Sequence, residues 1–208
     1  MKYSVFAFLS IMFAMAMTGC DTSSSSGTSA PSAGTGDFSG FELTAINGSK
    51  MQHAAKYDAN NLADEEGYVL NGKKEGSWLT YFPTKTTDKV GERRIKTLEN
   101  YVNGQIEGVA LEFDQRGQII KKIYYHNGNY HGFNVTYKFG RPQEIIPYRD
   151  GRIHGKVIKY YSNGKVREEI GYKDGLQHGT YSHYNEEQKL DMQYEYKDGE
   201  KVSGGMVK

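Results

Sequence analysis

The stretch YRDGRIHGKVIKYYSNGKVREEIGYKDGLQHG, residues 148–179, decides the fold. It contains the pattern Tyr-x-Asp-Gly-x-x-His-Gly twice, with the turn signal Ser162-Asn163-Gly164 between the two copies. Asp-Gly and Asn-Gly favour tight type I′ hairpin turns, because both central residues of that turn need a positive φ. Each copy therefore predicts two strands, here residues 156–161 and 166–172, joined and followed by tight turns.

The same unit recurs through most of the chain. Its first Gly falls at Gly72, Gly104, Gly128, Gly151, Gly175 and Gly199, with spacings of 32, 24, 23, 24 and 24 residues. A fixed period in this range indicates a repeat architecture. The spacing of 32 arises from about eight added residues around 85–93, which we expect to extend one hairpin tip as a tolerated loop or as a contact for a partner.

Alternation along each strand predicts which residues share a face. Three residues after the second Gly of successive units stand Leu79, Leu111, Val135, Ile158 and Ser182, and five residues after it stand Tyr81, Phe113, Tyr137, Tyr160 and Tyr184. The residues between them are mostly polar, and this period of two predicts one apolar face and one wet face. A column of tyrosines is expected from Tyr101, Tyr125, Tyr148, Tyr172 and Tyr196. The predicted fold class is all-β, an elongated single-layer antiparallel sheet of successive β-hairpin repeats.

At these residues the chain resembles the MORN-type repeat family in its bacterial variant. The copies are Tyr101-Val102-Asn103-Gly104 with Glu107-Gly108, Tyr125-His126-Asn127-Gly128 with His131-Gly132, Tyr148-Arg149-Asp150-Gly151 with His154-Gly155, and Tyr172-Lys173-Asp174-Gly175 with His178-Gly179. Their eight glycines are the expected structural turn residues. The repeats are placed at residues 67–208, after an N-terminal cap or degenerate repeat at 37–66. The resemblance implies a scaffolding, membrane-apposed or protein-binding module, and some bacterial relatives are antitoxin-like.

The N-terminus predicts export and lipid anchoring. An apolar run from Val5 to Met17 fits the core of a signal peptide at residues 1–19, and small residues precede Cys20, the single Cys of the chain. This arrangement resembles a lipobox and predicts lipidation of Cys20, although cleavage elsewhere with Cys20 as a bystander is the alternative. Residues 20–36 are rich in Ser, Thr and Gly and predict a disordered tether. The expected location is the bacterial cell envelope, lipid-anchored to the outer membrane in preference to the inner one, with the domain in the periplasm or on the cell surface.

The charge of the chain is balanced overall but unevenly distributed. With 26 Lys and Arg against 25 Asp and Glu, no general attraction to nucleic acid is indicated. Residues 109–173 nevertheless carry 12 basic and 6 acidic side chains. They form either a solvated surface with scattered charges or a basic band that faces an anionic surface.

The sequence predicts no reaction chemistry. His131, His154 and His178 share one slot of the repeat, but equivalent residues of neighbouring units should lie roughly 10 Å apart, too far to converge on one metal ion. We expect these histidines to bond the local backbone. Repeats place similar residues in columns, whereas an active site needs unlike residues at one spot. The prediction is therefore a non-enzymatic protein with no catalytic residues, no metal and no cofactor.

Binding is the remaining class of function. Most aromatic rings should build the core, and the candidates for an exposed binding surface are Trp78, Tyr137, Tyr160, Tyr161 and Tyr184. The leading hypothesis is a lipid-anchored scaffold that holds a protein partner and contacts the membrane through its anchor. A glycan- or cell-wall-binding module that uses these aromatics is the second hypothesis, and an antitoxin- or immunity-like protein is the third.

Overall fold

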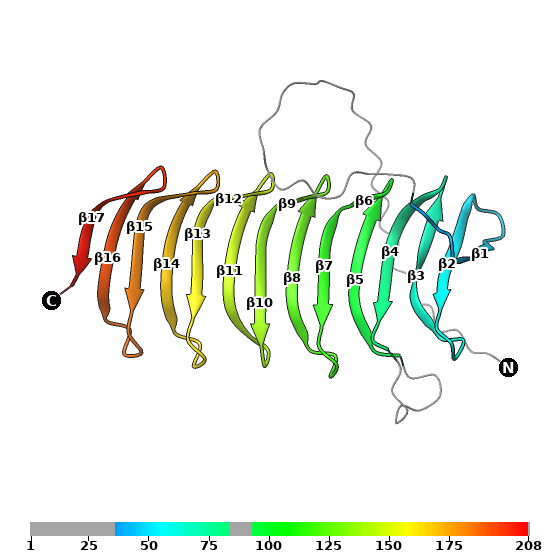
Figure 1. Ribbon diagram of the computed structural model, residues 1–208, viewed down its shortest axis with the longest axis horizontal. Helices are drawn as coiled ribbons and strands as arrows, with labels where there is room; N and C mark the ends of the chain where they lie inside the picture. The colour runs from blue at the N-terminus through cyan, green and yellow to red at the C-terminus, as the bar shows by residue number, and fades with distance from the viewer. Residues whose placement is uncertain (1–35, 84–92, 208) are drawn as a thin grey trace, which may run out of the picture.

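The protein is one open antiparallel sheet, seen in a computed structural model that describes residues 36–83 and 93–207 (Figure 1). Successive hairpins pair side by side along the sheet. The predicted fold class is therefore confirmed. The signal peptide, Cys20, the tether as far as residue 35 and most of the 85–93 insertion lie outside the described residues. In the described part of the chain, no helix is long and apolar enough to cross a membrane.

Within residues 36–83 and 93–207, seventeen strands make up the sheet. They are β1 (Glu42–Ala45), β2 (Met51–Tyr57), β3 (Ala63–Leu70), β4 (Lys73–Tyr81), β5 (Ile95–Val102), β6 (Gln105–Ile106), β7 (Gly108–Phe113), β8 (Ile119–His126), β9 (Asn129–Tyr130), β10 (Gly132–Lys138), β11 (Arg141–Arg149), β12 (Arg152–Ile153), β13 (Gly155–Tyr160), β14 (Val166–Lys173), β15 (Leu176–Tyr184), β16 (Leu190–Lys197) and β17 (Glu200–Met206). The two-residue strands β6, β9 and β12 are the starts of longer strands that are interrupted before the second Gly of the unit. Residues 37–66 contribute β1, β2 and the first half of β3 to the same sheet.

The paired glycines bend the backbone as their sequence context predicts. At one edge of the sheet, both central turn residues have positive φ in Asn103-Gly104 (50° and 83°) and in Asp150-Gly151 (50° and 78°). Asn127-Gly128 and Asp174-Gly175 do the same. The second glycines also have positive φ, at 77° for Gly108, 78° for Gly132, 111° for Gly155 and 79° for Gly179.

Each second Gly lies opposite a column tyrosine. The registers pair Gly76 with Tyr101, Gly108 with Tyr125, Gly132 with Tyr148, Gly155 with Tyr172 and Gly179 with Tyr196. An aromatic ring across from a glycine covers backbone that would otherwise be exposed, a device also used in designed sheets. The predicted tyrosine column therefore exists, and we call the face that carries it the tyrosine-column face.

One unit has a shorter turn at the opposite edge of the sheet. Five residues connect β7 with β8 and β13 with β14, whereas β10 and β11 are joined by the two-residue turn Phe139-Gly140. Phe139 has a φ of 52°, which is uncommon for a bulky side chain. The turn is three residues shorter, whereas β10 and β11 are each one residue longer than β7 and β8, so the unit is one residue shorter and gives the single spacing of 23.

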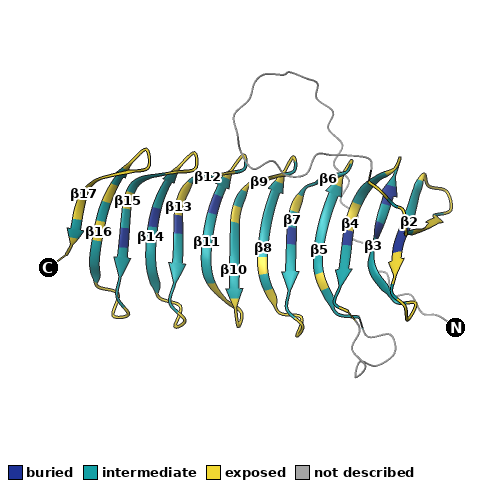
Figure 2. Ribbon diagram, viewed as in Figure 1, coloured by how far each residue is buried: buried dark blue, intermediate teal, exposed yellow. Residues whose placement is uncertain are grey.

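The apolar residues are divided between both faces, which corrects the expectation of one apolar and one wet face. Trp78, Ala110, Val157 and Ile170 are buried (Figure 2). The strand registers place all four on the tyrosine-column face. The predicted row from Leu79 to Ile158 lies on the other face, which we call the aliphatic-row face, and is half-buried. In a one-layer sheet no second layer covers a whole face, so a residue is buried only where large neighbouring side chains or a local covering segment enclose it.

The best-packed cluster of the described residues surrounds Trp78. Its side chain is 1% exposed and contacts Phe38 and Phe41, whose ring centroids lie 6.1 and 5.8 Å from its own. The indole N–H donates to the carbonyl of Tyr68 (3.1 Å). Including Trp78 in an exposed binding surface was therefore wrong, because residues that precede the first strand fold over its ring.

Arg93, at the end of the inserted residues, is a structural clamp. Its guanidinium pairs with Asp58 (3.3 Å) and Asp64 (3.0 Å) and donates to the carbonyl of Ala63 (2.8 Å). Its side chain is only 11% exposed. This end of the insertion therefore fixes the loop between β2 and β3.

Replacing Gly155 with Val is expected to destabilise the protein by about 1 kcal/mol or more, because Val disfavours a positive φ. A Cβ at this position would also lie 3.3 Å from Cγ of Pro147. Gly108→Asn is the matched control, since Gly108 has open space around it and Asn tolerates positive φ. Urea unfolding compares the two variants, and equal stabilities would contradict the role of Gly155.

Candidate functional site

The predicted aromatic surface is only partly assembled. Tyr137, Tyr160 and Tyr184 follow Val135, Ile158 and Ser182 by two residues and lie with them on the aliphatic-row face. Equivalent strands of neighbouring units are roughly 10 Å apart, so these three rings form an open row. All three are half-buried. Tyr161 lies in the adjoining turn and donates its hydroxyl to the carbonyl of Tyr184 (2.8 Å), which ties two units together.

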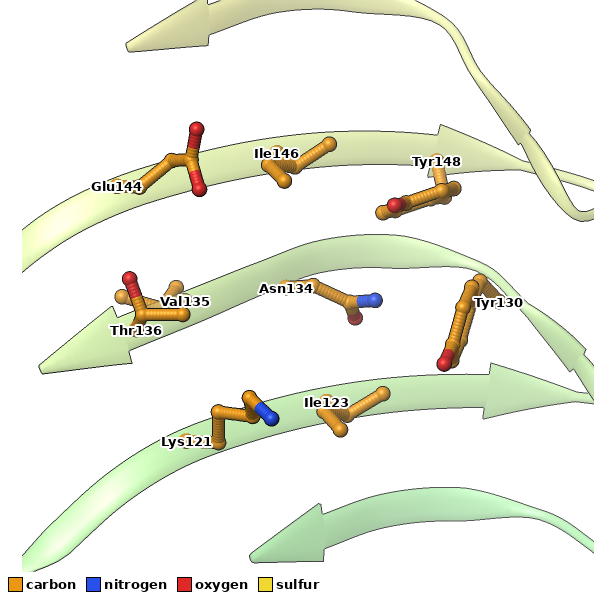
Figure 3. Close-up of a pocket in the computed structure, with 9 residues that line it drawn as sticks. All are labelled: Lys121, Ile123, Tyr130, Asn134, Val135, Thr136, Glu144, Ile146 and Tyr148. Atoms are coloured by element: carbon orange, nitrogen blue, oxygen red, sulfur yellow. The ribbon is translucent and has the colours of Figure 1, made fainter. Parts of the chain in front are cut away.

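A hollow on the tyrosine-column face is a second candidate, and sequence reasoning missed it. It lies between β8, β10 and β11 and has a volume of about 170 Å³. Figure 3 shows the residues that line it: Lys121, Ile123, Tyr130, Asn134, Val135, Thr136, Glu144, Ile146 and Tyr148. The rings of Tyr130 and Tyr148 are at one end, and the polar groups of Lys121, Thr136 and Glu144 are at the other (Figure 3).

Tyr130 and Tyr148 form the aromatic end of the hollow, and Tyr125 packs against Tyr130. The ring centroid of Tyr130 lies 5.0 Å from that of Tyr148 and 5.2 Å from that of Tyr125. Burial raises the pKa of Tyr148, and the nearby Tyr130 and Glu144 raise it further. The raised pKa keeps the Tyr148 hydroxyl protonated, so it is able to donate a hydrogen bond. Tyr130 remains 39% exposed, so its ring is accessible from solvent.

Asn134 is held in a fixed orientation at the centre of the hollow. Its Oδ1 accepts a hydrogen bond from the backbone N–H of Tyr124 (3.0 Å). The ladder between β8 and β10 pairs only Val135 and Thr136 of β10, so the side-chain carbonyl replaces a backbone partner. Because the oxygen is committed, the amide NH₂ is the group left to donate into the hollow.

The hollow forms in the unit where the residues at two positions of the repeat both differ from those in the other units. Two residues after the first Gly stand Lys74, Ile106, Tyr130, Ile153, Gln177 and Lys201, and only one of these is aromatic. Two residues after the second Gly stand Trp78, Ala110, Asn134, Val157 and Tyr181. Asn134 is the one amide in that slot, between Ile123 and Ile146 (Figure 3). Departure from the repeat consensus was the signal that could have identified this site.

A regular latch joins the turns at the edge that carries the paired glycines. From Gly104 to Gly199, the backbone N–H of the first Gly donates to a carbonyl of the preceding unit, as in Gly151 to Tyr130 (2.9 Å) and Gly175 to Ile153 (2.8 Å). In two units a Glu adds to this contact, since Glu107 accepts from the N–H of Asn127 (2.6 Å) and Glu75 from that of Asn103 (2.7 Å).

The repeat histidines belong to this latch. They contact the turn aspartate of the next unit at 3.4 Å for His131–Asp150, 3.0 Å for His154–Asp174 and 3.2 Å for His178–Asp198. The expectation that they bond only their local turn was incomplete, because each reaches across to the next unit. Among the described residues, no group of three or more His, Cys, Asp or Glu is placed to hold a metal ion.

Arg149→Ala is expected to raise the pKa of Asp174. The Arg149 guanidinium, followed by His154, holds that pKa below its usual value, so Asp174 stabilises the fold above the unfolded-state pKa. This stabilisation is lost as pH falls through the folded-state pKa. A carboxyl NMR titration measures the change. Asp114 is the control, because a backbone bond from Gln118 is the main cause of its lowered pKa; equal changes at both carboxyls would contradict the assignment.

The basic stretch at 109–173 does not form one band. Lys121 and Lys159 lie on the tyrosine-column face, where they pair with Glu112 (3.2 Å) and Glu168 (3.1 Å). Lys156 lies on the aliphatic-row face with Glu169 (2.9 Å), and Arg149 is at the glycine-turn edge. The arrangement favours the interpretation of a solvated surface with scattered charges.

Comparison with known proteins supports the repeat assignment in two places. A family model described as MORN repeat variant matches residues 106–127 and 153–174. These segments run from β6 to the turn after β8 and from β12 to the turn after β14. MORN repeats are generally modules that bind proteins or membranes. No curated protein matches the chain.

Proposed function

We propose that this chain is a non-enzymatic, lipid-anchored repeat protein of the bacterial cell envelope that serves as a scaffold for a protein partner. The supporting observation is a one-layer sheet of successive hairpins (Figure 1), in which the strand registers place like residues in columns. Such a sheet presents long surfaces for binding. The repeat histidines His131, His154 and His178 are engaged in the latch between turns.

The protein partner is assigned to the aliphatic-row face. The row of Val135, Ile145 and Ile158 runs beside the row of Tyr137, Tyr160 and Tyr184. Aromatic groups next to aliphatic ones are typical of the centre of a protein interface. Among the described residues, the segment that packs over the best-buried cluster, residues 38–41, lies on the other face with Trp78.

Crosslinking in intact cells tests the partner. A photo-crosslinking phenylalanine analogue in place of Tyr160 is expected to capture one defined protein, and the same protein should be captured from position 137. The matched control replaces Lys159, whose side chain lies on the opposite face of the same strand. Equal capture from positions 159 and 160, or none from 137 and 160, would argue against this face.

The anchor is tested separately by metabolic labelling with palmitate. Label should enter the wild-type chain and be absent from Cys20→Ala. Equal incorporation into both chains, or none into either, would remove the lipid anchor while leaving the partner hypothesis intact.

A further inference from the structure

We propose that the hollow between β8, β10 and β11 binds a single ring of a neutral sugar. This inference goes beyond the protein-scaffold function and does not rest on it, because the hollow lies on the opposite face of the sheet from the Tyr160 row. The ligand class follows from the size of the hollow, the chemistry of its walls and the signs of its charges.

The size of the hollow limits the bound part of the ligand to a single ring. Its volume is about 170 Å³, and an apolar protein cavity of about 150 Å³ holds one benzene molecule. A six-membered ring therefore fits, with part of its rim in solvent. A polysaccharide would place one residue in the hollow and run across the remainder of the open face.

The walls suit the apolar side of a sugar. A pyranose ring presents C–H groups on its faces and hydroxyls around its rim. Tyr130 and Tyr148 supply two tilted aromatic rings, and Ile123 and Ile146 supply the aliphatic lining (Figure 3). Binding sites for small molecules combine such an apolar lining with a few polar groups that fix orientation.

The polar groups offer both kinds of hydrogen bond that a hydroxyl needs. Lys121 and the amide NH₂ of Asn134 donate, the Glu144 carboxylate accepts, and the Thr136 hydroxyl does both. A sugar hydroxyl likewise donates and accepts, so it can satisfy both sets of groups. Asn134 is already oriented by Tyr124, which lowers the entropy cost of binding.

The charges favour a neutral ligand over an ion. Lys121, which also pairs with Glu112 (3.2 Å), and Glu144 stand at the same end of the hollow and carry opposite charges (Figure 3). An anion in the hollow would meet the Glu144 carboxylate, and a cation would meet the Lys121 ammonium group. A hydroxyl-rich neutral ring avoids both repulsions.

An NMR titration of the full-length chain tests this proposal. Glucose, galactose and N-acetylglucosamine are each added up to about 100 mM, because one ring with few contacts should bind with a Kd on the order of 1 mM. At least one of these sugars should give saturable shifts of the Asn134 side-chain amide and of the Ile123 methyl groups. Acetate tests a negative charge without a sugar ring, and methylammonium tests a positive one. Neither ion should shift the Asn134 or Ile123 signals.

Variants locate the site and separate binding from folding. Tyr130→Ala should weaken sugar binding at least tenfold while keeping the wild-type melting temperature within a few degrees, because Tyr130 is 39% exposed. Glu144→Gln should weaken it several-fold. Tyr160→Ala, on the opposite face, should bind sugar like the wild type. The proposal is overturned if no sugar gives saturable shifts, if Tyr130→Ala binds like the wild type, or if the ions shift the same signals. None of these results depends on the partner captured from position 160.

Discussion

Trp78→Ala is expected to lower the free energy of unfolding by about 3–5 kcal/mol, the range measured when a buried aromatic is truncated. The ring is 1% exposed, and it is enclosed by Phe38, Phe41 and Tyr101. The Nζ atom of Lys74 lies 4.0 Å from its centroid. Removal leaves a cavity, takes away the N–H that donates to the Tyr68 carbonyl, and leaves the Lys74 ammonium group with the more distant Tyr101 ring, at 5.0 Å. Urea unfolding followed by circular dichroism measures the loss, since the substitution also removes the single Trp.

Two controls define what this result means. Trp78→Phe keeps an aromatic ring but removes the N–H that donates to Tyr68, so its stability should lie between wild type and Trp78→Ala. Phe139→Ala removes an aromatic side chain that is 69% exposed and should change stability by about 0.5 kcal/mol or less. If Trp78→Ala were as mild as Phe139→Ala, the cluster around Trp78 would not be a core.

The parts of the fold that follow from local chemistry could be predicted from the sequence. Asn-Gly and Asp-Gly need no distant contact to favour positive φ at both positions, and Asp150-Gly151 has this geometry. Repetition then extends a local rule along the chain, because each unit packs chiefly on its neighbours. The tyrosine column was predicted for the same reason, since equal spacing places each Tyr at the same register.

Burial could not be predicted in the same way. Alternation correctly identified residues that share a face, as in Val135 and Ile158, but it does not show what covers that face. Trp78 is buried by Phe38 and Phe41, which precede the first strand and belong to no repeat. No periodic pattern could have indicated that contact.

The hollow was not predicted because the sequence pattern was interpreted through the residues that the units share, and the hollow is built from residues that differ between units. Tyr130 and Asn134 are unremarkable as single residues, and each is unusual only when compared with the same slot in other units. Their joint effect also depends on Ile146 and Tyr148 from the next strand. In a repeat protein the consensus describes the scaffold, and non-consensus residues that meet in space mark the place where a specific ligand would bind.

Gly171→Ala should produce the second large loss, about 3 kcal/mol, for a steric reason alone. A Cβ at Gly171 would lie 2.3 Å from the carbonyl oxygen of His178 and 3.4 Å from that of Thr180. Both atoms are backbone of β15, so the clash cannot be relieved by rotating a side chain. The register between β14 and β15 shifts at this point, and the added methyl group should force the two strands apart.

The location of the destabilised strands in Gly171→Ala tests whether each unit is stabilised mainly by its immediate neighbours. Because each unit packs mainly on its neighbours, amide exchange in Gly171→Ala should accelerate from β15 to β17 and stay near the wild-type rate from β2 to β8. Gly205→Ala is the matched control, since Gly205 lies in a strand, its Cβ position is open and its φ is ordinary. An equal increase in exchange along the whole sheet would mean that the hairpins unfold as a single unit. In that case the sheet would have a cooperativity that contacts between neighbouring strands do not supply.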